Sequence, residues 1–101
     1  MSKEYKSPAE IITCTFDYTG LCEEITSATI SVACIKGGID PTPAQILQGQ
    51  PLIDGPLVRQ RVMGGLSGTT YALCCLANDN DGERPEVVIY LDVRPRVPDE
   101  A

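Results

Sequence analysis

The chain has 101 residues, a net charge of −6 and 43% hydrophobic residues, with one Phe and no Trp. This length fits one domain, and a core built mainly from Ile, Val, Leu, Ala and Cys favours strands over helices. The eight Lys and Arg residues are scattered, which argues against direct nucleic-acid binding because phosphate recognition needs a concentrated basic surface. No segment has the apolar length of a signal peptide or a membrane span, so we expect synthesis in a cytosol and no membrane partner.

The five cysteines are Cys14, Cys22, Cys34, Cys74 and Cys75, and the chain has no His. An odd number without a Cys-x-x-Cys pair fits neither a disulfide framework nor a zinc site. Adjacent Cys74 and Cys75 point to opposite faces of a strand, so they cannot share one metal or one partner thiol. We expect most of them to be free thiols, at least three of them buried, and we expect no metal and no cofactor.

The domain is expected to occupy residues 9–95. Residues 1–8 are polar and are predicted to form a mobile or docking N-terminal arm that ends at Pro8. Residues 96–101 follow a first proline and contain another, so they are predicted to form a tail that leaves the sheet.

Two strands with one apolar face each are predicted in the first third of the chain. The first begins near Ile11, and three of its residues are expected on one face: Ile12, Cys14 and Phe16. The second covers residues 25–34 and turns four residues inward: Ala28, Ile30, Val32 and Cys34. Ile25 falls off the parity of this second strand, which predicts a β-bulge near Ser27.

The middle of the chain, residues 39–56, is rich in proline and has two readings. The segment that starts at Asp40-Pro41 is compatible with one helical turn that has Pro at its start, and equally with a short edge strand. A brief strand and a turn are predicted over residues 51–56. Residues 57–63 alternate again, and there Arg59 and Arg61 are expected to face water, or to form a docking patch for an acidic partner.

The clearest pattern begins at Gly68 and Thr69, which are expected to form a bend that delivers Tyr71 to the start of a strand. In immunoglobulin-like sandwiches a Tyr in this position is buried in a corner, with its hydroxyl bonded to backbone a few residues upstream. The strand over residues 71–78 and the next over residues 86–93 are joined by an Asn-Asp-Gly turn, so they form a closing hairpin. We therefore predict an all-β fold: an immunoglobulin-like or fibronectin III-like sandwich of about seven strands.

The strand that starts at Tyr71 has an unusual second face. If Tyr71 and every second residue after it are buried, then Ala72, Cys74 and Leu76 line the outer face. An isolated sandwich normally carries polar residues there. An exposed apolar row of this kind is typical of a protein interface, and we take these three residues, with Arg59 and Arg61, as candidate interface residues.

Signals for catalysis are weak. Hydrolases that use a Cys or Ser nucleophile commonly need an imidazole base, and the chain has no His. Asp79, Asp81 and Glu83 suggest a short calcium loop or an acid/base pair, but they also fit a solvated hairpin turn. The glycines of residues 64–68 do not form a phosphate loop, because a strand follows them instead of a helix. We expect no catalytic residues and no enzyme activity.

Two resemblances converge on these segments. The Leu-Ser-Gly-Thr-Thr-Tyr motif of residues 66–71, with the turn at Gly82, resembles the closing hairpin of fibronectin type III domains. Over a longer stretch the chain resembles small structural proteins of tailed bacteriophages. The resemblance lies in the segment 7–12 with Phe16-Asp17, the Ile-Thr-Ser-Ala motif of residues 25–28 and the Gly-Gly-x-x-Gly-Thr-Thr-Tyr motif of residues 64–71. The Cys74-Cys75 pair and the proline-rich middle depart from that pattern.

The resemblance implies a structural protein of the virion with an immunoglobulin-like fold. It implies binding to other virion proteins as a capsid decoration, neck or tail-adaptor subunit, and a homo-oligomer in the particle. The alternative is a host-surface adhesion or carbohydrate-binding module, which usually needs exposed aromatic residues. The position within the virion, the copy number and the symmetry do not follow from the sequence.

Overall fold

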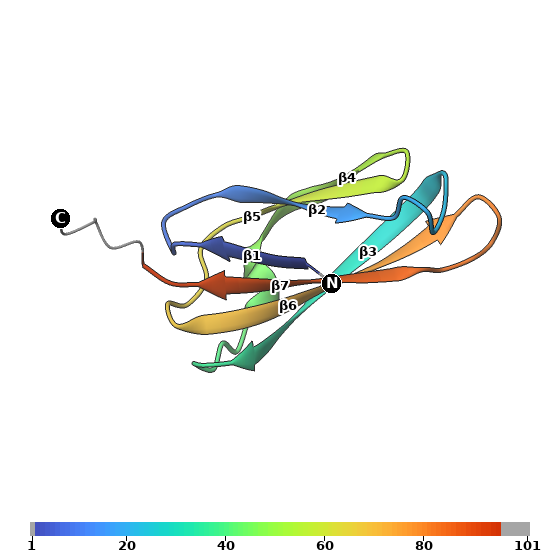
Figure 1. The fold of residues 1–101 in the computed structure, drawn as a ribbon. Coiled ribbons are helices and arrows are strands. Elements are labelled where there is room, and N and C mark those ends of the chain that lie inside the picture. Colours follow the sequence, from blue (N-terminus) through green and yellow to red (C-terminus); the bar gives the residue numbers. More distant parts are fainter. Residues whose placement is uncertain (1, 96–101) are drawn as a thin grey trace.

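The computed structural model describes residues 2–95, which form two stacked sheets (Figure 1). The predicted C-terminal tail, residues 96–101, lies outside the described residues. The elements in chain order are β1 (Ser2–Lys6), β2 (Ile12–Asp17), β3 (Ile25–Lys36), the 3-10 turn η1 (Pro43–Ile46), β4 (Leu47–Asp54), β5 (Leu57–Val62), β6 (Thr69–Asp79) and β7 (Glu86–Val93).

The strand order is that of an immunoglobulin-like sandwich. One sheet has the order β1-β7-β6-β3 and the other has the order β2-β5-β4. The three-stranded sheet matches the strands B, E and D of that fold, and β3, β6 and β7 match the strands C, F and G. All pairs are antiparallel except β1 with β7. The predicted all-β sandwich of seven strands is confirmed.

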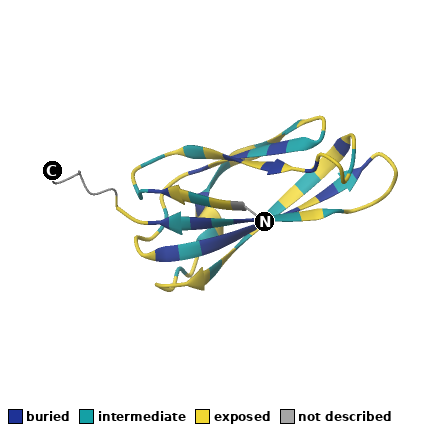
Figure 2. Ribbon diagram, viewed as in Figure 1, coloured by how far each residue is buried: buried dark blue, intermediate teal, exposed yellow. Residues whose placement is uncertain are grey.

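The core lies between the two sheets and is formed by alternate residues of each strand. Tyr71, Leu73, Cys75 and Ala77 of β6 are all fully buried. They face Cys14 and Phe16 of β2 and Val58 and Val62 of β5 in one core cluster. Figure 2 shows the resulting alternation of buried and more exposed residues along the strands. The period-2 pattern of the sequence predicted these inner rows, because alternate side chains of a strand share a face.

β3 has the predicted irregularity. Its pairing with β6 shifts register between Ile25 and Ser27, and again between Cys34 and Lys36. Between these points the ladder is regular. The bulge that the sequence predicted near Ser27 is therefore present, and it explains why Ile25 is buried although it lies off the parity of the strand.

The N-terminal segment differs from its prediction. Residues 2–6 are not an arm outside the sandwich: they form β1, which extends the four-stranded sheet next to β7. Lys6 ends this strand with a fully buried side chain, and its ammonium group donates hydrogen bonds to the carbonyl oxygens of Ser7 and Gly64. Burial lowers the pKa of Lys6. The polar residues of this segment gave no sign of a strand, because the strand pairs through its backbone with β7, which is distant in the chain.

In the proline-rich middle, the segment that starts at Asp40 forms the helical turn, one of the two structures left open by the sequence. Residues 43–46 form a single 3-10 turn with Pro near its start, and the chain continues directly into the edge strand β4. Ile46, at the end of the turn, is buried and anchors this connection in the core.

Candidate functional site

Tyr71 anchors the N-terminal end of β6. Its side chain is fully buried, and its hydroxyl accepts a hydrogen bond from the backbone N–H of Leu66 at 2.9 Å. The same hydroxyl donates to a carboxylate oxygen of Asp40 at 2.8 Å. Burial raises the pKa of Tyr71 to about 12. Tyr71 thus has the surroundings of a corner tyrosine, with an added bond from the β3–β4 connection.

Two glycines allow this end of the sheet to close. Gly68 has a φ of +82°, in the left-handed region that favours glycine, and its N–H donates to Val93. Gly37 has a φ of +91°, and a Cβ there would lie 2.0 Å from the carbonyl oxygen of Gly68. The end of β3 and the bend before β6 therefore touch through backbone alone.

The outer face of β6 is apolar and becomes more exposed along the strand. The exposed fraction is 8% for Ala72 and 38% for Leu76, and Cys74 between them is half-buried. On β7, Tyr90 lies opposite Ala72 and Val88 lies opposite Cys74. In antiparallel sheets such partners share a face, so these five residues form one surface, which we call the β6–β7 patch.

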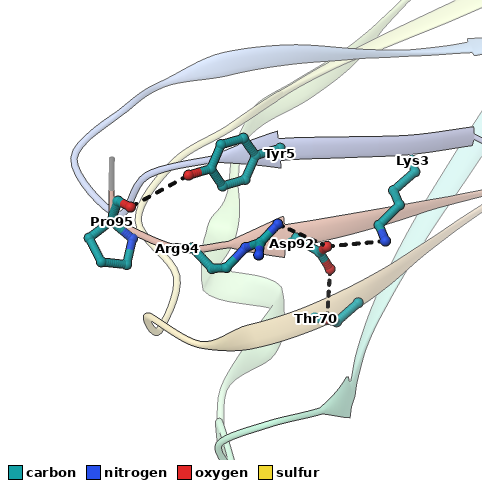
Figure 3. A network of polar contacts seen from close by, with 6 residues as sticks. All are labelled: Lys3, Tyr5, Thr70, Asp92, Arg94 and Pro95. Atoms are coloured by element: carbon teal, nitrogen blue, oxygen red, sulfur yellow. Dashed lines mark hydrogen bonds and ion pairs between the residues drawn. The ribbon is translucent and has the colours of Figure 1, made fainter. Parts of the chain in front are cut away.

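The patch ends in a polar network around Asp92 of β7 (Figure 3). One carboxylate oxygen of Asp92 accepts a hydrogen bond from the Thr70 hydroxyl at 2.7 Å. The other oxygen lies 3.4 Å from the ammonium group of Lys3 and 3.8 Å from the guanidinium group of Arg94. The Thr70 hydrogen bond and these two cations lower the pKa of Asp92.

Arg94 also lies over the ring of Tyr5, 5.0 Å from its centroid, and the Tyr5 hydroxyl donates to the carbonyl of Pro95 at 3.5 Å. β1 therefore adds an aromatic ring to the polar end of the patch (Figure 3). The cation and the ring attract each other, which orders the edge of the sheet there.

A shallow hollow of about 490 Å³ lies at this end of the sheet. It is lined by Tyr90 and Asp92 of β7, by Ile35 and Lys36 at the end of β3, and by the two glycines. Lys3 and Arg94 also line it. Three cations and one carboxylate thus line the hollow in a protein whose net charge is −6, so the hollow is locally basic.

Arg59 and Arg61 lie elsewhere. They lie on β5, in register with Thr15 and Thr13 of β2, on the outer face of the three-stranded sheet. Arg59 makes an ion pair with Asp54 at 3.0 Å. A hollow of about 600 Å³ there is lined by both arginines and by Leu52. The five residues predicted as one interface are thus divided between the two opposite outer faces of the sandwich.

All five cysteines are free thiols. Cys14 and Cys75 are buried, and the other three are half-buried, so fewer are buried than the three that the sequence predicted. Burial raises the pKa of Cys14 to about 11 and also raises the pKa of Cys75 and of Cys22. These thiols therefore stay protonated at neutral pH, whereas a thiol nucleophile must be ionised.

The acidic loop between β6 and β7 provides hydrogen-bond donors for the carboxylate of Asp79. Asp79 is nearly buried, and one of its oxygens accepts hydrogen bonds from the backbone N–H groups of Asp81 and Glu83, at 2.8 and 2.9 Å. This is the bonding of a turn. Within the described part of the chain no three His, Cys, Asp or Glu side chains lie close enough to hold a metal ion.

Sequence reasoning missed Tyr18. Its side chain is fully buried, and its hydroxyl donates to the carbonyl oxygen of Cys75 at 2.6 Å, which joins the end of β2 to β6 across the core. Tyr18 continues the alternation of Cys14 and Phe16, so the signal was present. It was lost because Thr19 and Gly20, which follow, mark a turn.

No protein-family model and no curated protein sequence matches this chain. Over residues 2–95 there is no helix of the length and hydrophobicity needed to cross a membrane.

Proposed function

We propose that the protein is a non-catalytic binding module that docks to other proteins through the β6–β7 patch. The observation that carries this proposal is the apolar row Ala72, Cys74 and Leu76 on the outer face of a central strand. The opposite row of β6 already supplies the core, so the outer row is not needed for folding. Apolar rows of this kind, rimmed by polar groups, commonly mark protein interfaces.

The polar end of the patch adds orientation. Lys3, Lys36 and Arg94 provide positive charge next to the apolar row, and this suits a partner that presents a carboxylate beside an apolar surface. Complementary charges of this type fix the register of a docked partner more than they add affinity.

On the resemblance to small structural proteins of tailed bacteriophages, we propose that the partners are virion proteins of the capsid, neck or tail. The chemistry of the described residues suits this role, since the buried thiols are protonated and the carboxylate of Asp79 is bonded to backbone groups of its own turn. A protein that repeats on a particle needs one well-defined docking face and no active site.

The test is a pair of matched substitutions on opposite outer faces. Leu76→Lys places a charge at the exposed end of the patch, whereas Leu52→Lys places the same charge on the outer face of the three-stranded sheet, where Leu52 is 64% exposed. Both variants should fold, as judged by thermal unfolding. We expect incorporation into phage particles, measured by quantitative mass spectrometry, to fall at least about tenfold for Leu76→Lys, because burying an added ammonium group in an apolar contact is unfavourable.

Leu52→Lys should be incorporated like the wild type. Equal incorporation of both variants would exclude the patch as the docking surface. Absence of the wild-type protein from purified particles would exclude the virion role and leave the binding module without that partner.

The hollow favours a second candidate, a carbohydrate-binding module. Tyr90 presents part of an aromatic ring there beside Asp92 and Lys3, and sugars stack on such rings and bond to flanking polar groups. Tyr90→Ala should then abolish binding in a glycan-array measurement. A wild-type protein that binds no glycan on the array would remove this candidate.

A further inference from the structure

β3 has one unpaired edge. It is the last strand of its sheet and pairs only with β6; at its start the N–H of Ile25 donates to the carbonyl oxygen of Gly55. The chain then crosses to the other sheet through η1. In variable-type immunoglobulin sandwiches the corresponding edge is covered by additional strands. Figure 1 shows β3 at the border of its layer. A free edge presents a row of unpaired N–H and C=O groups to any extended chain.

Each of the other three edge strands is short or interrupted, and β3 is neither. β2 has only six residues. β1 is short, with charged residues at three of its five positions. β4 contains Gly49 and Pro51, where its pairing is interrupted. In contrast, β3 runs for 12 residues without proline, and its only charged residue is Lys36 at the end. Long, uncharged edges are those that natural proteins normally protect.

The core is also less well covered along β3. Its inward-facing residues are Ala28, Ile30, Val32 and Cys34, and all four remain half-buried. The inward-facing residues of neighbouring β6 are fully buried. An added strand beside β3 would bury the exposed parts of these four side chains, which is favourable in proportion to the apolar area removed from water.

The charges at the two ends of β3 are complementary to each other. Glu23 and Glu24 precede the strand and Lys36 ends it, and all three side chains are exposed. A strand of this length spans roughly 40 Å at the usual rise per residue, so these groups cannot meet within one chain. In an antiparallel pair of β3 strands centred on Ile30, residues six positions on either side are opposite each other. Glu24 of one copy then lies opposite Lys36 of the second copy, at both ends.

We propose that two copies of this chain associate through their β3 edges, antiparallel about a two-fold axis at Ile30. This inference goes beyond the proposed docking function. It joins two four-stranded sheets into one and places both β6–β7 patches on the same continuous face. In that register Ala28 of one copy lies beside Val32 of the second copy. The half-buried, inward-facing residues of each β3 strand are then covered by those of the other copy.

A charge-swap experiment tests this arrangement on the purified protein, without any docking partner. The dimer dissociation constant is measured by sedimentation equilibrium for the wild type, Lys36→Glu, Glu24→Lys and the double variant. Each single variant creates like-charge pairs at both ends of the interface, and we expect its dissociation constant to rise about tenfold. The double variant restores opposite charges and should return to within about threefold of the wild type.

Arg61→Glu is the matched control, because it changes the net charge as Lys36→Glu does but lies on the central strand β5 of the other sheet. Its dissociation constant should equal that of the wild type. Hydrogen exchange provides the second readout: amides of residues 25–36 should exchange more slowly as the protein concentration rises.

A wild-type protein that remains monomeric up to about 1 mM would overturn the proposal, and the edge would then be open to a strand of another protein. A double variant as weak as the single variants would overturn the antiparallel register. Neither result bears on the Leu76→Lys test of docking, because that test measures particle incorporation and leaves β3 unchanged.

Discussion

The two faces of β6 have the same backbone and different surroundings. The inner row, from Tyr71 to Ala77, is completely buried, whereas the outer row passes from nearly buried Ala72 to exposed Leu76. Both rows are apolar. Burial in the core accounts for the inner row, and the outer row is the one for which we propose a docked partner. The hydrophobicity of a residue therefore does not show whether it faces the core or a proposed docking surface. Its position relative to the second sheet shows this.

The inner face is further held by two tyrosine hydroxyls. Tyr71 bonds to Leu66 and to Asp40 at one end, and Tyr18 bonds to the carbonyl of Cys75 further along the strand. Each bond links β6 to a different part of the chain. Changes to the inner face should therefore alter stability, and changes to the outer face should alter association.

The largest effect is expected for Tyr71→Ala. The substitution removes a fully buried ring and leaves Asp40 and the N–H of Leu66 without their partner, so it should reduce the free energy of unfolding by about 3 kcal/mol or more. Urea denaturation measures this, and Tyr90→Ala on the outer face is the control, with a smaller loss. If Tyr71→Ala unfolds within a few tenths of a kcal/mol of the wild type, the corner does not hold the fold.

Alkaline pH should destabilise the protein through the inner face. The pKa of Cys14 is about 11 in the folded protein against an ordinary value of 9.0, so the folded state retains its proton longer. Its contribution is present below about pH 9 and is lost as the pH rises to about 11, at most about 3 kcal/mol. The raised pKa of Cys75 acts in the same direction, while the lowered pKa of Lys6 acts against it.

Urea denaturation between pH 7.5 and 10.5, with reductant present, measures this loss. Cys14→Ala should weaken the dependence on pH. A free energy of unfolding that is constant over this range would contradict the assigned burial of the thiols.

A smaller effect is expected for Tyr18→Phe. The ring stays in the core, but the carbonyl oxygen of Cys75 loses a donor, at a cost of about 1 kcal/mol. Tyr71→Phe should cost a similar amount. Because the two hydroxyls bond to different parts of the chain, the double variant should show the sum of both losses. A clear departure from additivity would show that the two ends of β6 are coupled.

The smallest effect is expected at the polar end of the outer face. Asp92→Asn removes the charge that Lys3 and Arg94 approach, and because both cations are largely exposed the cost should be about 1 kcal/mol or less. The pKa of Asp92 is lowered, so its contribution is present above the ordinary carboxyl pKa and is lost as the pH falls below it. A loss as large as that of Tyr71→Ala would place Asp92 among the residues that hold the fold.

The inner rows were predictable because alternation is a local signal, and so was the bulge near Ser27, which shows as a break in that alternation. The burial of Lys6 was not predictable, because its carbonyl partner at Gly64 is 58 residues away. The same holds for the bond between Tyr71 and Asp40, 31 residues apart. That Arg59 and Arg61 lie on the opposite outer face from Leu76 was not predictable, because alternation shows which residues share a face of one strand but not which sheet the strand joins.

Adjacent Cys74 and Cys75 allow the most direct test of the docking surface, since they report on the two faces of β6 in one experiment. Alkylation followed by mass spectrometry is carried out on the free native protein and on the assembled particle. We predict that Cys74 reacts in the free protein and is protected in the particle, while Cys75 reacts in neither until the protein unfolds. Cys22, which is half-buried in the β2–β3 connection, serves as the internal reference for reagent access. A Cys74 that reacts equally fast in both states would contradict docking through the outer face of β6.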